Sequence, residues 1–143
     1  MITFVGEADF FSKNFWGMIE RLPIYKKTYE LTSTIYDAMA QFPKLHRYTL
    51  GEHILNKTYS LFKWIVKANK EKDEKRVEAI EEYLSDFEEL RVFLRICEEK
   101  HILKINTLTN IFLLIDDIAN QATGWKNYTI KEIEKKKCRG ESI

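Results

Sequence analysis

The sequence predicts an all-α fold, namely an antiparallel up-down-up-down four-helix bundle with an aromatic N-terminal arm and a basic C-terminal tail. Three observations support this prediction. The 143 residues include only five glycines and two prolines, too few turn residues for a many-stranded β fold. No proline follows Pro43, so long helices are allowed over the rest of the chain. Apolar residues recur at three- and four-residue steps in four successive segments.

The first predicted helix spans residues 22–42. Pro23 suits the first turn of a helix. The apolar positions at helical spacing are Ile24, Leu31, Ile35, Ala38 and Phe42. A second stripe is rotated by one residue and consists of Tyr25, Tyr29, Thr32 and Tyr36. Because this stripe is too aromatic for an ordinary solvated face, we expect two faces of the helix to be covered.

The second predicted helix follows the Phe42-Pro43 pair, since the residue before a proline is disfavoured in the α region. Its start is either Lys44 or the capping-box pattern at residues 49–52, and we favour the earlier start. The helix continues to about Asn69. Its apolar positions are Leu50, Ile54, Leu55, Leu61, Phe62, Ile65 and Val66.

The third and fourth predicted helices complete the bundle. The third spans about residues 74–100, after a polar link. The fourth begins at Asn106 or Thr107, either of which can cap it, and ends near Gly124. Four amphipathic helices joined by short links bury their apolar stripes by packing antiparallel in sequence.

These elements divide the chain into an arm (residues 1–21), a bundle (residues 22–128) and a charged tail (residues 129–143). The arm is unusually aromatic for a segment outside a bundle, with Phe10, Phe11, Phe15 and Trp16. It either folds back over the end of the bundle as a short helix or serves as a partner-docking arm. The tail is predicted to be solvated and frayed.

The chain is predicted to be cytoplasmic. Its first residues include Glu7 and Asp9 and do not form a secretory signal. No segment has the roughly 18 consecutive apolar residues of a membrane span, so we expect no membrane partner. The two cysteines, Cys97 and Cys138, form neither a disulfide framework nor a metal-ligand pattern, and we expect both to be reduced.

The sequence lacks the residue patterns of catalytic and metal sites. The three histidines, His46, His53 and His101, are spread over three segments, without an HExxH or a cysteine-histidine cluster. Asp116 and Asp117 are adjacent, so on a helix they point about 100° apart, and the Glu-x-x-His pattern of di-iron bundles is absent. We therefore predict a non-enzymatic protein with no metal and no cofactor, which works by binding.

Basic residues are the candidates for that binding. The net charge of +1 conceals an asymmetry. Residues 22–70 include eight basic and three acidic residues, whereas residues 71–105 include seven basic and eleven acidic residues. Clusters such as Lys26-Lys27 attract phosphates through counterion release. Arg91 and Arg95 are equally consistent with ion pairs along their own helix and with contacts across an interface.

Three blocks of the sequence resemble the accessory variability determinant family of diversity-generating retroelements. They are LPIYKKTYEL at residues 22–31, FPKLHRYTLG at residues 42–51 and LRVFLR at residues 90–95. The resemblance covers about residues 22–128, including the order of the four helices. A broader relative is the four-helix protein family encoded in intervening sequences of large-subunit rRNA genes, which shares the Phe-Pro turn.

This resemblance implies a homopentamer that binds the reverse transcriptase of the element and its template RNA, and that supports mutagenic cDNA synthesis without being the polymerase. The RNA- or polymerase-contacting positions it implies are Lys26, Lys27, Lys44, His46, Arg47, Arg91, Arg95 and Lys104. It makes Tyr25, Tyr29 and Tyr36 a subunit-packing face. The alternative is a structural or protein-binding bundle of the rRNA intervening-sequence type without RNA-binding activity.

Overall fold

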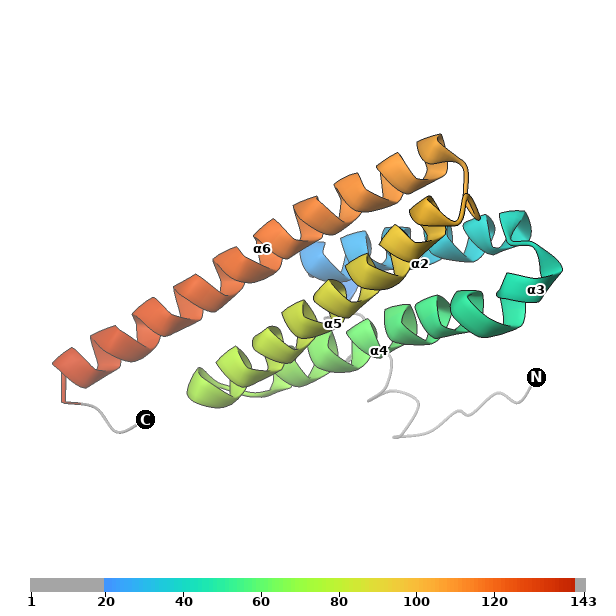
Figure 1. The fold of residues 1–143 in the computed structure, drawn as a ribbon. Coiled ribbons are helices and arrows are strands. Elements are labelled where there is room, and N and C mark those ends of the chain that lie inside the picture. Colours follow the sequence, from blue (N-terminus) through green and yellow to red (C-terminus); the bar gives the residue numbers. More distant parts are fainter. Residues whose placement is uncertain (1–19, 141–143) are drawn as a thin grey trace, which may run out of the picture.

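The computed structural model describes residues 20–140, and within this range it contains four long helices and no strand (Figure 1). The helices are α2 (Pro23–Ala38), α4 (Glu52–Lys70), α5 (Asp73–Glu99) and α6 (Ile105–Cys138). The predicted all-helical class with four helices is confirmed. The predicted N-terminal arm lies outside the described residues, apart from its last two positions.

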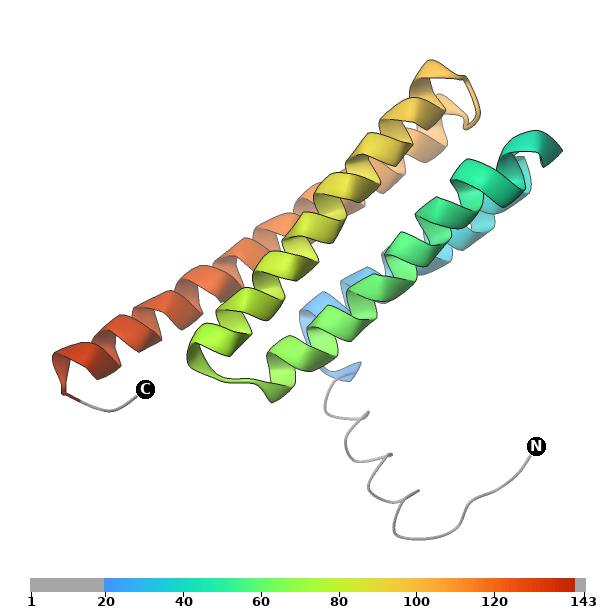
Figure 2. The same cartoon turned by 60° about the horizontal axis from the view of Figure 1, so that its bottom comes forward.

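The links between the helices lie at alternate ends of the molecule, so the chain reverses direction at each of them (Figures 1 and 2). Helix α2 packs against α4 and α6, and α5 packs against the same two helices. Each helix therefore has two neighbours and turns its apolar stripe toward a shared core.

The core consists mainly of aliphatic side chains, to which every helix contributes. Leu31, Leu61, Phe87 and Ile111, one from each helix, are fully buried. Thr28 and Tyr83 form a polar pair among them. The Thr28 hydroxyl donates to the Ile24 carbonyl at 2.7 Å, and a second hydrogen bond joins the Thr28 hydroxyl to the Tyr83 hydroxyl. The phenol is thus buried with its hydrogen-bonding group satisfied.

The connection between α2 and α4 turns in a series of short helical segments. A 3₁₀ turn, η1 (Met39–Gln41), ends α2, and α3 (Lys44–His46) begins directly after Pro43, as the earlier of the two predicted starts requires. A π-type turn, η2 (Arg47–Gly51), then leads into α4. The capping-box pattern at residues 49–52 therefore lies inside a helical segment and does not begin one.

Helix α6 differs from the prediction. It does not end near Gly124 but continues to Cys138, so the residues expected to be frayed are helical. Thr129 and Ile133 are buried and continue the apolar stripe by two steps of four residues beyond Trp125. A glycine inside a helix costs about 1 kcal/mol relative to alanine, and the packing of the next two turns outweighs this cost.

The last turns of α6 extend past the start of α5, at the end of the bundle where α4 is linked to α5 (Figure 1). The Lys136 ammonium lies 2.8 Å from an Asp73 carboxylate oxygen and ties this part of α6 to α5. Across the described residues, the helices carry no apolar stretch of the length a membrane crossing needs.

Candidate nucleic-acid interface

One end of the bundle, here called the turn end, combines the α2–α4 connection (residues 39–51) with the α5–α6 link (residues 100–104). The two meet because Gln41 Nε2 donates to Thr107 Oγ1 at 3.0 Å, and the Lys104 amide donates to Gln41 Oε1 at 3.4 Å. The turn end carries four of the eight predicted contact residues, namely Lys44, His46, Arg47 and Lys104.

The cationic groups of the turn end face solvent. Lys44, Arg47 and Lys104 are exposed, whereas His46 is half-buried. Arg47 Nη2 donates to the Phe42 carbonyl at 3.3 Å, which holds the guanidinium beside the end of α2. Within residues 20–140, neither Lys44 nor Lys104 has a carboxylate within 4.0 Å. Their charges are therefore available to a polyanion.

Lys26 and Lys27 lie at the opposite end of α2. Lys26 lies twelve residues before Ala38 on α2, so it is about 18 Å from the turn end. Lys26 is exposed, but the Lys27 ammonium lies 3.4 Å from an Asp117 oxygen and 4.0 Å from Glu30. A single chain does not bring this pair together with the cations of the turn end.

Arg91 and Arg95 line a cleft between α5 and α6, in acidic surroundings. Arg91 Nη1 lies 2.7 Å from Asp116 Oδ1, and Arg91 Nε lies 3.6 Å from Glu88. Arg95 is exposed, and the other acidic side chains of the cleft are Glu98 and Glu99. The pairing with Asp116 crosses between helices and was not foreseen from the sequence. Because the carboxylates outnumber the guanidiniums, this cleft does not favour a polyanion.

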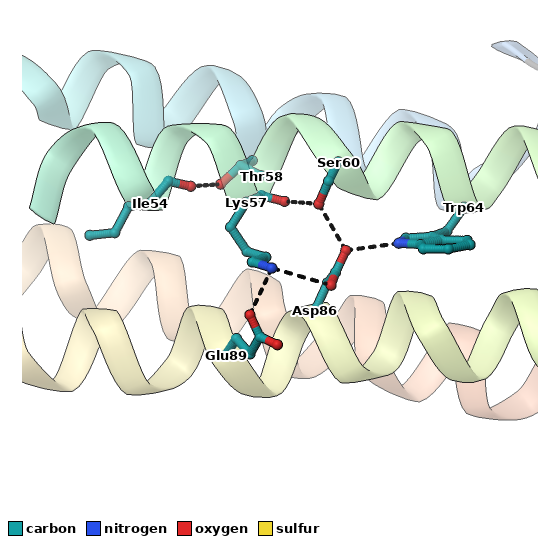
Figure 3. Close-up of polar contacts among 7 residues, drawn as sticks. All are labelled: Ile54, Lys57, Thr58, Ser60, Trp64, Asp86 and Glu89. Carbon is teal, nitrogen blue, oxygen red and sulfur yellow. Dashed lines mark hydrogen bonds and ion pairs between the residues drawn. The ribbon is translucent and has the colours of Figure 1, made fainter.

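A polar network between α4 and α5 was also not predicted from the sequence (Figure 3). Its centre is Asp86, which is 9% exposed. Asp86 Oδ2 accepts hydrogen bonds from Ser60 Oγ at 2.8 Å and from Trp64 Nε1 at 2.9 Å. The Lys57 ammonium lies 3.6 Å from Asp86 Oδ1 and 2.7 Å from Glu89. The hydrogen bond to Glu89 raises the pKa of Lys57.

This network joins two helices and offers nothing to a ligand, because both oxygens of its central carboxylate already have partners. A signal for it exists in the sequence. Asp86 lies three residues after Tyr83 and four before Leu90, so it occupies a position of the apolar stripe of α5. An acidic residue at such a position indicates a buried, partnered carboxylate. In the described part of the chain, no cluster of three or more His, Cys, Asp or Glu side chains is arranged to hold a metal ion.

The tyrosine stripe of α2 forms one wall of an open groove of about 440 Å³, here called the tyrosine groove. Tyr29 and Tyr36 are 62% and 63% exposed. Tyr25 is half-buried and meets Phe62 of α4 edge-on, with ring centroids 5.5 Å apart. Tyr59 of α4 contributes to the opposite wall. An exposed aromatic patch of this kind is typical of a surface that a partner covers.

Comparison with known families identifies the chain. A family model described as bAvd-like matches residues 22–129, which include the turn end, the tyrosine groove and the Arg91 cleft. The chain belongs to the bAvd-like family. The resemblance to accessory variability determinant proteins is thereby confirmed. No protein with a curated description matches this bAvd-like chain. The match ends at Thr129, whereas α6 continues to Cys138, so the last turns of the helix extend beyond the shared family segment.

Proposed function

We propose that this bAvd-like protein is a non-catalytic, cytoplasmic accessory protein of a diversity-generating retroelement. It binds the template RNA and the reverse transcriptase of the element, and it assists mutagenic cDNA synthesis. The observation that carries the proposal is the family match over residues 22–129. The exposed cations of the turn end give this role a physical basis, since phosphate contacts supply most of the sequence-independent affinity for nucleic acid.

Among the eight predicted contact residues, the geometry favours those without carboxylate partners. Lys44, Arg47 and Lys104 lie on adjoining connections and face solvent, so they can follow the backbone of one RNA strand. Lys26 supplies a separate contact near the start of α2. Arg91 contributes less, because it would have to leave Asp116 in order to reach a phosphate.

The tyrosine groove supports self-assembly, with Tyr25, Tyr29 and Tyr36 as the subunit-packing face. In a ring, the turn ends of several protomers lie at regular intervals, so one RNA can contact more cations than one chain offers. This reconciles the separation of Lys26 from the turn end with a shared RNA path. Five subunits is the number that the family resemblance implies.

RNA affinity as a function of salt concentration tests the proposal. The purified protein should bind single-stranded RNA, and log K should fall steeply with log salt, by about 0.7 for each phosphate contact. The triple variant K44Q/R47Q/K104Q should weaken binding and flatten this slope by about 2. The control is Lys63→Gln on α4, a lysine that lies over the Trp64 ring and outside the turn end. Absence of RNA binding by the unmodified protein at low salt would refute the proposal.

The alternative, a protein-binding bundle without RNA affinity, is favoured by one observation. Two of the predicted contact cations, Lys27 and Arg91, are engaged by Asp117 and Asp116. Co-purification with the reverse transcriptase after nuclease treatment separates the two functions. Retention of the polymerase together with no measurable RNA affinity would establish the alternative.

A further inference from the structure

Within residues 20–140, the end of the bundle opposite the turn end carries a larger excess of positive charge than the turn end does. This region, here called the basic end, comprises residues 67–76 at the α4–α5 link and residues 126–139 of α6. It carries eleven basic and five acidic residues, an excess of six. The turn end with its flanking turns, residues 41–52 and 95–107, carries five basic and three acidic residues, an excess of two. None of the eight predicted contact residues belongs to these two segments; Lys26 and Lys27 lie nearby, at the start of α2.

The two segments of the basic end are held together by tertiary contacts. The Lys136–Asp73 ion pair at 2.8 Å joins them, and the Arg76 guanidinium lies 5.7 Å from the centre of the Trp125 ring. Arg76 Nε also donates to the Ala68 carbonyl at 2.8 Å, which fixes the end of α4 to the start of α5. Burial of Ile133 anchors the last turns of α6. The cations are therefore presented on a folded surface and not on a loose tail.

Compensation of the helix dipole explains only part of this charge. Lysines in the last turn of a helix offset the partial negative charge there, and the effect falls off within that turn. Lys135, Lys136 and Lys137 lie in the last turn of α6. Lys126 and Lys131 lie seven or more residues before its end, so the dipole does not account for them.

One face of α6 at the basic end interleaves an aromatic ring with cations. Tyr128, Lys131 and Lys135 follow one another at steps of three and four residues, so their side chains lie along one side of the helix. Tyr128 is 64% exposed, and both lysines are exposed. The Lys135 ammonium lies 3.3 Å from Glu132, in a surface ion pair weak enough for a phosphate to replace. Surfaces that bind single-stranded nucleic acid combine two components, namely cations that contact the phosphates and aromatic rings on which bases stack. This face of α6 offers both.

We infer that the basic end is a second RNA-binding surface, which holds a single-stranded stretch through phosphate contacts of Lys131 and Lys135 and through base stacking on Tyr128. This inference rests on the proposed function and extends it to residues that reach past the shared family segment. RNA bound at both ends of the bundle would run along the length of the helices. The chain would thus bind a longer stretch of RNA than the turn end alone permits.

The test uses the full-length protein and a fluorescent oligouridylate of about 20 nucleotides, long enough to span several binding subsites. K131Q/K135Q should reduce the salt slope by about 1.4, which corresponds to roughly 25-fold weaker binding near 0.1 M salt. Tyr128→Ala should weaken binding at least about 5-fold, whereas Tyr128→Phe, which keeps the ring, should not. K131R/K135R, which keeps the charge, should bind like the unmodified protein.

The charge-matched variant K44Q/K104Q at the turn end separates this inference from the proposed function. If K44Q/K104Q weakens RNA binding while K131Q/K135Q and Tyr128→Ala leave it unchanged, the basic end is not an RNA surface and the proposed function stands. The inference is equally overturned if K131Q/K135Q abolishes only polymerase binding, because the surface then recognises a protein. If the unmodified protein binds no RNA, the proposed function itself fails. Circular dichroism of each variant checks that α6 stays helical.

Discussion

Asp86 is a carboxylate buried between α4 and α5, where it accepts hydrogen bonds from Ser60 and Trp64 and lies near the Lys57 ammonium. Asp86→Ala would leave the indole N–H without its acceptor, so we expect the free energy of unfolding to fall by about 2–3 kcal/mol. Urea denaturation measures this loss. In the W64F background the same substitution should cost less, because the indole donor is already absent; equal losses in both backgrounds would argue against the hydrogen bond.

Cys97 is fully buried, and burial raises the pKa of its thiol from an ordinary value of 9.0 to about 11. The unfolded chain therefore releases this proton at lower pH than the folded chain does. The stabilisation is complete below pH 9 and is lost as the pH rises toward 11. Between these limits the unfolding free energy should fall by on the order of 2 kcal/mol more in the unmodified protein than in Cys97→Ala. Parallel pH profiles for the two proteins would contradict this.

At the scale of elements, two glycines inside helical segments have opposite roles. A Cβ at Gly51 would lie 3.1 Å from Phe42 Cδ2 and 3.3 Å from the His46 carbonyl oxygen, besides 2.6 Å from the flexible tip of Met39, because the π-type turn packs closely against residues 39–46. A Cβ at Gly124 would meet nothing within 4 Å. We expect Gly124→Ala to stabilise the protein by about 0.5–1 kcal/mol.

Gly51→Ala should lower stability by about 1 kcal/mol, since the same gain in helix propensity is outweighed by overpacking. Thermal unfolding of the two single variants, measured side by side, provides the comparison. A stabilised Gly51→Ala protein would show that the Met39 side chain moves aside without cost. The α2–α4 turn would then be less tightly packed than its geometry indicates.

Some helix boundaries follow from the local sequence pattern, whereas others are decided by tertiary packing. The starts of α3 and α5 were predicted within one residue, because Pro43 and the polar link at residues 69–73 act locally. The end of α6 was predicted wrongly. Gly124 is a local signal for a helix end, whereas the burial of Thr129 and Ile133, which continues the helix, depends on the neighbouring helices.

At the scale of the whole molecule, the tyrosine groove controls assembly if the proposed function is correct. Y29E/Y36E would place two carboxylates in the proposed subunit interface, and a buried unpaired charge is strongly unfavourable. The unmodified protein should elute as a multimer, with the pentamer at about five times the chain mass of 17.1 kDa. The variant should elute near the mass of one chain.

Light scattering coupled to size-exclusion chromatography measures both masses. Because Tyr29 and Tyr36 are more than half exposed, the variant should retain its helical content. The double substitution K63E/K67E, which adds carboxylates to α4 outside the tyrosine groove, is the control and should leave the mass unchanged. An unmodified protein that is monomeric at all concentrations would rule out the groove as a subunit interface.

The sequence by itself determined the all-helical class, the four helices and the family, because periodic apolar residues, scarce glycine and proline, and three short blocks are properties of the chain alone. The tyrosine stripe and the cations of the turn end were candidates from the sequence and from the family resemblance, and their roles stay predictions. Only the tertiary structure decided which charges stay unpaired. Arg91 is neutralised by Asp116 from another helix, Asp86 is buried, and α6 carries its lysines to the α4–α5 link. The Arg91–Asp116 pair, the burial of Asp86 and the position of the α6 lysines all depend on which helix faces meet. Those meetings bring together residues that are distant in sequence, so a local pattern does not predict them.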